Sequence, residues 1–139
     1  MSYSPNLLKN LGIKLAMEFA KEKRPSEIRL FQAILLQAFE DSMSNSGFKK
    51  DTYWKEDSHK WFIGNCQDFQ EVCWNADMDP QMIREEYIKL IKKGVIKFSK
   101  LQRSWINYRQ YYKAYRSAKP KEERAEVKKK IYSGKVKIR

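Results

Sequence analysis

Residues that build turns, disulfides and catalytic centres are scarce in this chain. Its 139 residues include 5 glycines, 4 prolines, 2 cysteines and 1 histidine. So few glycines and prolines disfavour a turn-rich all-β fold, and the Lys, Glu, Leu, Ile and Gln content favours helices. Two cysteines, Cys66 and Cys73, are too few for a disulfide framework, which indicates a reduced, cytoplasmic setting.

Long apolar runs are also missing. None approaches the roughly 18 residues that a membrane-spanning helix needs. The first residues, MSYSPNLLKNLG, lack a charged region followed by a long apolar stretch, so they do not predict a secretory signal. We therefore expect no membrane partner and a cytoplasmic location.

Motifs for catalysis and for metal or cofactor binding are missing as well. A single histidine, His59, gives no basis for a catalytic triad, and no glycine-rich phosphate loop occurs. The spacing of His59, Cys66 and Cys73 resembles no zinc pattern, and a fourth ligand is lacking. We expect both cysteines to be small hydrophobic residues of the core, and we expect neither catalysis nor a cofactor.

What the sequence does contain is positive charge, concentrated in its second half. The formal net charge is +12. Residues 1–83 hold 10 Lys/Arg and 12 Asp/Glu, a balance of −2, whereas residues 84–139 hold 19 Lys/Arg and 5 Asp/Glu, a balance of +14. This concentration predicts a nucleic acid partner, whose phosphates release counterions when lysine and arginine bind. An anionic membrane would attract the same charge, and a solvated basic surface without a partner is the plain alternative.

Apolar spacing predicts a compact all-α helical bundle. Residues 6–23 have apolar side chains at helical spacing, and so do residues 27–43, where Ser26 is expected to be the N-cap. The second of these helices is apolar around most of its circumference, which is typical of a central, buried helix. Residues 44–58 are polar and contain a glycine, which predicts a connection with aromatic side chains, Tyr53 and Trp54, docked onto the core.

A helix-turn-helix-like unit is predicted at residues 68–94. Asp68 is expected to cap a short helix over 68–76, which buries Phe69, Val72, Cys73 and Ala76. In the next segment, Asp79 can cap a helix that begins at Pro80, and Gly94 can end it. An ordinary helical corner without a DNA-binding role is the alternative.

The predicted helix 80–93 would present one face to DNA. Its inward residues are Ile83, Tyr87, Leu90 and Ile91, and its outward residues are Gln81, Arg84, Glu85, Ile88 and Lys92. In the major groove, Arg84 can donate two hydrogen bonds to guanine and Gln81 can pair with adenine.

A long aromatic helix is expected at about 100–118. Its stripe consists of Leu101, Trp105, Tyr108, Tyr112 and Tyr115, and beside it lies a basic line of Arg109, Lys113 and Arg116. Basic side chains interleaved with aromatic rings suit a nucleic acid, although packing of the rings on the core is the simpler interpretation. Residues 1–118 would form the domain, and 119–139 a basic arm that contacts phosphates without reading sequence.

Two stretches carry a resemblance to a known group of proteins. They are RLFQAILLQAFEDSM and DTYWKEDSHKWFIGNCQDFQEVCWNADMDPQMIR, and together the similarity covers about residues 28–84. The matching residues are Trp61, Phe69, Val72, Cys73, Ala76, Asp79, Pro80, Ile83 and Arg84, with Phe31, Ile34, Gln37, Ala38 and Asp41 upstream. This pattern resembles small phage and prophage helix-turn-helix proteins, and it implies a phage-type regulator located in the host cytoplasm. Asp77 stands where the pattern usually has glycine.

Charge, pattern and resemblance together predict a transcriptional regulator that binds double-stranded DNA. The side chains expected to contact DNA are Gln81, Arg84, Glu85, Lys89, Lys92, Lys93, Lys97, Lys100, Arg103, Arg109, Lys113 and Arg116. Two alternatives stay open. One is an RNA-binding protein, and the other is an interaction protein that acts on RNA polymerase or another host factor.

Overall fold

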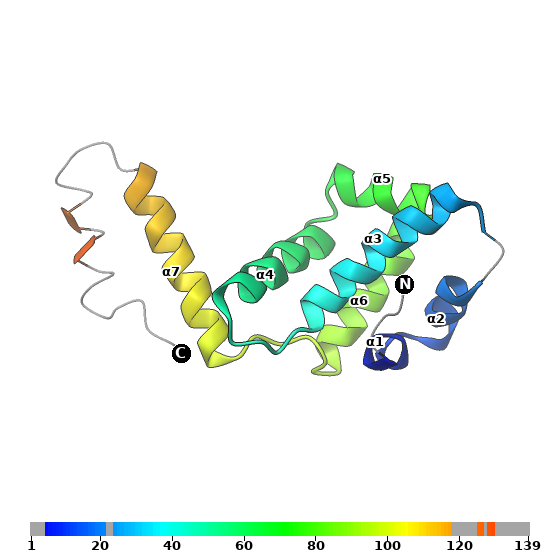
Figure 1. Cartoon of the computed structure of the whole chain (residues 1–139), viewed down its shortest axis with the longest axis horizontal. Coiled ribbons are helices and arrows are strands. Elements are labelled where there is room, and N and C mark those ends of the chain that lie inside the picture. The colour runs from blue at the N-terminus through cyan, green and yellow to red at the C-terminus, as the bar shows by residue number, and fades with distance from the viewer. Residues whose placement is uncertain (1–4, 22–23, 118–124, 127, 130–139) are drawn as a thin grey trace. The chain divides into compact units, whose positions relative to one another are not determined.

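The fold is all-α, as the sequence predicts. The computed structural model, whose helices are labelled in Figure 1, describes residues 5–21, 24–117, 125–126 and 128–129. Over these residues its regular structure is helical, without a strand. The helices are α1 (Pro5–Asn10), α2 (Ile13–Ala20), α3 (Ser26–Met43), α4 (Lys49–Gly64), α5 (Gln67–Asn75), α6 (Pro80–Lys92) and α7 (Lys100–Ser117). Within this described part of the chain, no helix is both long enough and apolar enough to cross a membrane.

The chain divides into two compact units. The first unit consists of Met1–Ser44 and Trp54–Lys97, and the second unit consists of Asn45–Tyr53 and Phe98–Arg139. Helix α4 begins in the second unit and continues into the first. The basic arm expected at 119–139 lies outside the described residues, apart from 125–126 and 128–129.

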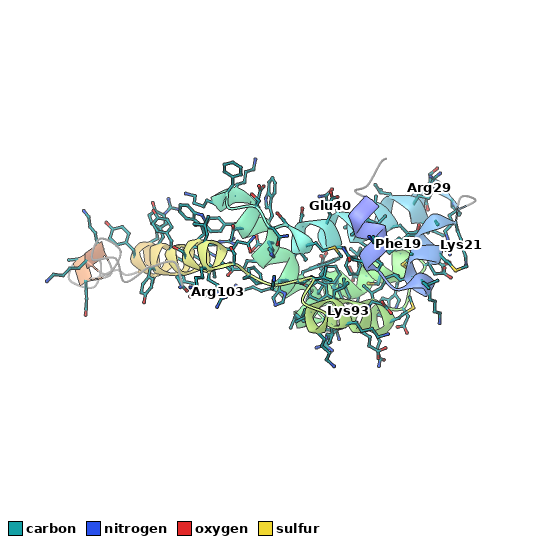
Figure 2. All side chains as sticks on the ribbon, turned by 90° about the horizontal axis from the view of Figure 1, so that it is seen from below. Phe19, Lys21, Arg29, Glu40, Lys93 and Arg103 are labelled. Atoms are coloured by element: carbon teal, nitrogen blue, oxygen red, sulfur yellow. The ribbon has the colours of Figure 1, made fainter. Side chains whose placement is uncertain are left out.

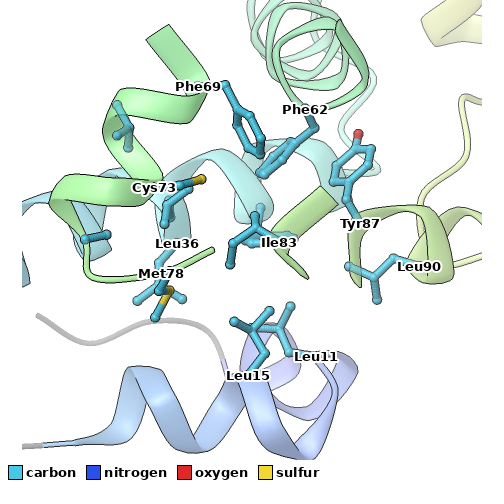
Figure 3. Close-up of a cluster of buried hydrophobic side chains, with 14 of the residues drawn as sticks. Leu11, Leu15, Leu36, Phe62, Phe69, Cys73, Met78, Ile83, Tyr87 and Leu90 are labelled. Atoms are coloured by element: carbon cyan, nitrogen blue, oxygen red, sulfur yellow. The ribbon is translucent and has the colours of Figure 1, made fainter. Parts of the chain in front are cut away.

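The core of the first unit is aromatic and aliphatic (Figure 3). Phe62 of α4, Phe69 of α5 and Tyr87 of α6 are fully buried and gather around Ile83, while Leu15 of α2 reaches the cluster from the opposite side. Helix α5 packs against both α3 and α6. Burial of these large side chains is the main favourable term that holds the three helices together.

The N-terminal segment is two helices instead of the single helix expected over 6–23. The break falls at Leu11 and Gly12. Leu11 is buried in the core, and the carboxylate of Glu86 lies against Gly12, where an added β-carbon would be 2.6 Å from Oε2 of Glu86. The end of the flexible Glu86 side chain therefore lies beside the break, and Gly12 is the N-cap of α2.

Helix α3 differs from its prediction at its start and on its surface. Pro25 is the N-cap and Ser26 is the first helical residue, so the expected Ser26 cap is wrong. Leu35 and Phe39 are fully buried, but Leu30 and Ile34 are 61% and 41% exposed. The helix is therefore buried on one face only, and the extra apolar residues lie at the surface.

The polar segment expected to be a connection is mostly helix, because α4 begins at Lys49. The buried positions at its centre are Thr52, Lys55 and Glu56. Since these residues are polar, the helix has no apolar stripe that its sequence would reveal. Trp54 is 48% exposed, so its expected docking on the core is wrong.

Lys55 binds the backbone at the two points where the chain passes from the first unit to the second. Its Nζ donates hydrogen bonds to the carbonyl oxygen of Ser44 at 2.7 Å and to that of Lys97 at 2.6 Å. The first unit is made of two chain segments, and Ser44 is the last residue of one segment and Lys97 the last residue of the other. Burial lowers the pKa of Lys55 from 10.5 to about 8, because the charged ammonium loses solvation.

Candidate nucleic-acid interface

Helices α5 and α6 meet through a tight turn at residues 76–79. The amide of Asp77 donates to the carbonyl of Trp74 at 3.0 Å, and the amide of Met78 donates to that of Cys73 at 2.9 Å. This pair of bonds is a Schellman motif, which requires a left-handed residue after the helix. Asp77 occupies that position with φ of +59°, so the turn expected of glycine forms with aspartate.

The turn is tied to the N-terminal part of the first unit. Nη1 of Arg24 lies 2.6 Å from Oδ2 of Asp77, and Nη2 lies 2.7 Å from Oε2 of Glu18. A hydrogen bond from Lys21, together with the charges of Lys21 and Arg24, holds the pKa of Glu18 below its ordinary value. Gln32 of α3 also donates to the carbonyl of Ala76, at 3.2 Å. The turn therefore has a fixed geometry relative to α2 and α3.

The start and end of α6 are as predicted. Oδ1 of Asp79 accepts a hydrogen bond from the amide of Gln81 at 3.1 Å, and Pro80 is the first helical residue. At the other end, Gly94 has φ of +78° and its amide donates to Ile91. At the start of α5 the prediction is wrong, because Cys66 is the N-cap. Asp68 accepts a hydrogen bond from Nε1 of Trp61 instead.

The inward face of α6 is locked into the core. Ile83, Tyr87 and Leu90 are buried, as predicted, and Ile91 packs against the cluster. The Tyr87 ring stacks on Phe62 with centroids 4.2 Å apart, and its hydroxyl lies 2.7 Å from Nδ1 of His59. Burial raises the pKa of Tyr87 to about 12 and lowers that of His59. With this face fixed, the rotation of α6 about its axis is also fixed.

The outward face of α6 carries the side chains predicted to read bases. Gln81 and Glu85 are exposed, and Nε2 of Gln81 lies 3.4 Å from Oε1 of Glu85. Arg84 is half-buried, and its Nε donates to the carbonyl of Ile63 at 3.4 Å. This long hydrogen bond directs one edge of the guanidinium toward Ile63 of α4.

A hollow lies beside the first turns of α6. Its volume is about 360 Å³. Its walls come from the α4–α5 turn, α5 and the start of α6, and they consist of Asn65, Gln70, Trp74, Asp79, Pro80, Gln81, Arg84 and Glu85. The base-reading residues predicted from the sequence therefore share their surface with an exposed tryptophan and several amides.

The cations in the last turn of α6 and in the segment that follows it are on the surface. They are Lys89, Lys92, Lys93 and Lys97, all exposed, and Figure 2 marks Lys93. Lys89 also lies 3.3 Å from Oε1 of Glu86. Lysines near the C-terminus of a helix stabilise it, because they interact favourably with the negative end of the helix dipole. A structural role therefore accounts for part of their presence.

Helix α7 of the second unit begins with a capping box. The amide of Gln102 donates to Oγ of Ser99 at 3.1 Å, and the amide of Ser99 donates to Oε1 of Gln102 at 3.0 Å. Nε2 of Gln102 also donates to Ser46, and Nε1 of Trp105 donates to Gly47, at 3.1 and 3.0 Å. Hydrogen bonds therefore position this helix against residues 45–53.

The aromatic stripe of α7 is not packed in a core. Gln102 and Ser104 are the buried residues of the helix, and Leu101 and Tyr112 are 37% and 39% exposed. Tyr108 and Tyr112 stack on each other with centroids 6.0 Å apart. The expectation that these rings pack on the core is therefore wrong, and they form a partly exposed ladder along the helix.

Of the predicted basic residues of α7, Arg109 contacts Tyr53 and the others have exposed side chains. Arg109 is half-buried, with its guanidinium 4.7 Å from the Tyr53 ring centroid and Nη1 3.4 Å from the Tyr53 carbonyl. The exposed cations are Lys100, Arg103, Lys113 and Arg116. Side chains extend from several sides of the helix, and Figure 2 marks Arg103. The helix sequence contains no acidic residue to balance these cations.

The cysteines differ from each other. Cys73 is buried, as expected, and burial raises the pKa of its thiol to about 12. Cys66 is exposed, so its expected place in the core is wrong. Over the described residues, no group of three or more His, Cys, Asp or Glu side chains has the arrangement of a metal site.

Comparisons with models of known protein families, with curated proteins and with solved structures found no match to this chain. The resemblance to phage-type helix-turn-helix proteins over residues 28–84 therefore stays a prediction. The function has to be inferred from the residues, charges and geometry of the chain itself.

Proposed function

We propose that this protein binds double-stranded DNA, with α6 in the major groove. The observation that carries the proposal is the corner between α5 and α6. Its turn is fixed by Asp77 and Arg24, its second helix is locked by buried Ile83 and Tyr87, and the opposite face of that helix exposes Gln81 and Glu85. A rigid helix with polar side chains near its N-terminus is what groove reading requires.

Base contacts would come from the first turns of α6. The contact of Arg84 Nε with Ile63 leaves its terminal nitrogens for guanine O6 and N7, and exposed Gln81 suits adenine. Glu85 repels phosphate but can accept a hydrogen bond from N4 of cytosine. In this arrangement Arg84 and Glu85 would read the two members of one G·C pair.

Phosphate contacts would come from exposed cations outside the reading face. The candidates are Lys89, Lys92, Lys93 and Lys97 after the reading turns, and Lys100, Arg103, Lys113 and Arg116 on α7. Such contacts supply affinity and set the register of the protein on the duplex, without sequence information. Removal of 119–139 should weaken binding to all duplexes about equally.

Transcriptional regulation is the biological role that we propose for this binding. It rests on the resemblance of residues 28–84 to phage-type regulators and on the helix-turn-helix-like geometry. Site-specific binding near promoters of the same genome is the outcome expected from genome-wide immunoprecipitation.

The experiment is selection of bound sequences from a random duplex pool with the full chain and with Arg84→Ala. The full chain should enrich one site, and the variant should lose preference at one base pair, worth about 1–3 kcal/mol. Arg29→Ala, at an exposed arginine of α3, is the matched control and should keep the preference. Site preference that survives Arg84→Ala would show that α6 does not read bases.

Binding to single-stranded RNA is a second candidate, favoured by the α7 ladder. Exposed Tyr112, stacked on Tyr108 beside Arg116, offers aromatic and cationic surface of the kind that single strands use. Competition of unlabelled RNA against a bound duplex separates the two candidates. The DNA proposal predicts that the selected duplex competes far better than RNA of equal length.

A further inference from the structure

The hollow beside α6 has the size of a binding site for a small group. At about 360 Å³ it lies at the lower end of the range of roughly 300–1,000 Å³ that small-molecule sites occupy. One wall includes Asn65, which has φ of +48° and whose carbonyl accepts a hydrogen bond from Nε2 of Gln70 at 3.0 Å. This wall is therefore fixed by backbone and side chain together.

Trp74 provides an aromatic surface at this hollow. It is 61% exposed, whereas its neighbours Val72 and Cys73 on α5 are buried. An indole of this exposure gains little from the core of the first unit, and its ring is available for stacking by a planar ligand.

Arg84 and Glu85, which line the hollow, can each form further hydrogen bonds. Nε of Arg84 is used by the carbonyl of Ile63, and no residue in the described part of the chain accepts from its terminal nitrogens. The carboxylate of Glu85 accepts from Gln81 at 3.4 Å, which is longer than a strong hydrogen bond. A ligand can therefore be met by donors from Arg84 and by acceptors from Glu85.

The charges around the hollow disfavour a phosphate. Asp79 and Glu85 contribute two carboxylates against the single guanidinium of Arg84. The amide of Gln81, which a phosphate at the helix start would use, already donates to Asp79. A neutral ring with acceptors on one edge and donors on another fits this wall better.

We propose that the hollow binds an unpaired guanine base of a nucleic acid. Guanine O6 and N7 would accept from Arg84, its N1–H and N2–H groups would donate to Glu85, and its ring would stack on Trp74. Recognition of unstacked bases through aromatic stacking and edge hydrogen bonds is common in single-stranded and looped nucleic acids. This inference rests on the proposed nucleic acid binding. Because Arg84 and Glu85 are also the residues proposed to read a G·C pair, a bound unpaired guanine replaces that contact.

The test is fluorescence anisotropy of labelled duplexes at low ionic strength. One duplex carries a bulged guanine, a second a bulged adenine, and a third is fully paired. The full chain should bind the guanine bulge about tenfold more tightly than the paired duplex, since one stacked base contributes about 1–3 kcal/mol. The adenine bulge should bind less tightly than the guanine bulge, because only guanine offers acceptors to Arg84 and donors to Glu85 together. Trp74→Ala should remove most of the advantage of both bulged duplexes and leave affinity for the paired duplex unchanged.

Two further variants define the site. Glu85→Gln should remove the preference for guanine over adenine, because the amide nitrogen replaces an acceptor. Trp54→Ala removes another exposed tryptophan of the first unit, outside the hollow, and should keep the preference. Thermal unfolding followed by circular dichroism checks that each variant folds.

The outcomes separate this inference from the proposed function. Equal affinity of the full chain for all three duplexes overturns the guanine site and leaves duplex binding intact. An advantage of the guanine bulge over the paired duplex that is unchanged in folded Trp74→Ala also overturns the site. Failure to bind any of the duplexes overturns the proposed function and the guanine site together.

Discussion

The two units of this protein hold their basic helices by different means. In the first unit, α6 buries Pro80, Ile83, Tyr87 and Leu90, and apolar packing fixes it. In the second unit, α7 buries only polar residues, Gln102 and Ser104, among its 18, and hydrogen bonds with stacked rings position it. Reading a base sequence needs a rigid surface, whereas attraction to phosphates needs mainly charge. The division of labour that we propose between the two helices follows this difference.

The two helices also differ in their balance of basic and acidic residues. Arg84, Lys89 and Lys92 of α6 are accompanied by Glu85 and Glu86. Helix α7 has five cations and no acid. Acidic residues beside a reading helix reduce unselective attraction to phosphate, and a helix without them attracts any polyanion. Specificity and general affinity are therefore expected to respond to mutations in different units.

Truncation of one aromatic ring in each unit should give the largest contrast. Phe62→Ala removes a fully buried ring of the first unit and should lower the free energy of unfolding by about 3–5 kcal/mol. Tyr112→Ala removes an exposed ring of the second unit and should cost less than about 1 kcal/mol. Urea denaturation of both variants measures the two values, and similar losses would show that α7 also depends on a buried core.

The stability of the first unit should rise between pH 8 and pH 9 because of Lys55. Its pKa is about 8 in the folded chain and 10.5 when solvated, so the unfolded state holds more protons in this range. The rise is limited to about 1.4 kcal/mol per pH unit. Above pH 9, the buried thiol of Cys73 acts in the opposite direction, since its pKa is raised to about 12.

The control for this prediction is Lys55→Met, in which the rise between pH 8 and pH 9 should disappear. The decrease at higher pH should remain in that variant, because Cys73 and Tyr87 are unchanged. Urea denaturation at half-unit pH intervals gives both curves. A rise of equal size in Lys55→Met would assign the effect to another group.

Removal of the N-cap side chains of α6 and α7 should give the smallest losses of stability. The loss should be global for one helix and local for the other. Asp79→Ala and Ser99→Ala each remove a side chain that accepts a hydrogen bond at a helix start, at a cost of about 1 kcal/mol. At α6 the loss should lower the global stability, because the helix is part of the core. At α7 it should increase local amide exchange alone. Hydrogen exchange resolved by residue distinguishes the two responses.

The helices with strong local signals could be predicted from the sequence. Asp79, Pro80 and Gly94 mark the start and the end of α6 through capping and backbone conformation, which act within a few residues. The buried face of α6 follows from its apolar spacing. The capping box of Ser99 and Gln102 is an equally local signal, and it would have placed the start of α7.

The errors occur where tertiary contacts outweigh the local pattern. The centre of α4 buries Lys55, whose partners Ser44 and Lys97 are distant in sequence, so no apolar stripe predicts this helix. The break at Leu11 and Gly12 places Leu11 in the core, a tertiary contact that helical spacing does not predict. The hollow depends on bringing Asn65 and Trp74 beside α6, which spacing along a single helix does not predict.

The most direct test of DNA binding is the salt dependence of affinity for a selected duplex. Each phosphate contact by Lys or Arg releases counterions, so the dissociation constant should rise steeply with salt, with a logarithmic slope of about 0.9 per contact. Substitution of Lys113 and Arg116 by glutamine should reduce this slope by about 2 and leave the preferred site unchanged. Absence of binding at low salt, or an affinity that salt does not change, would contradict the account.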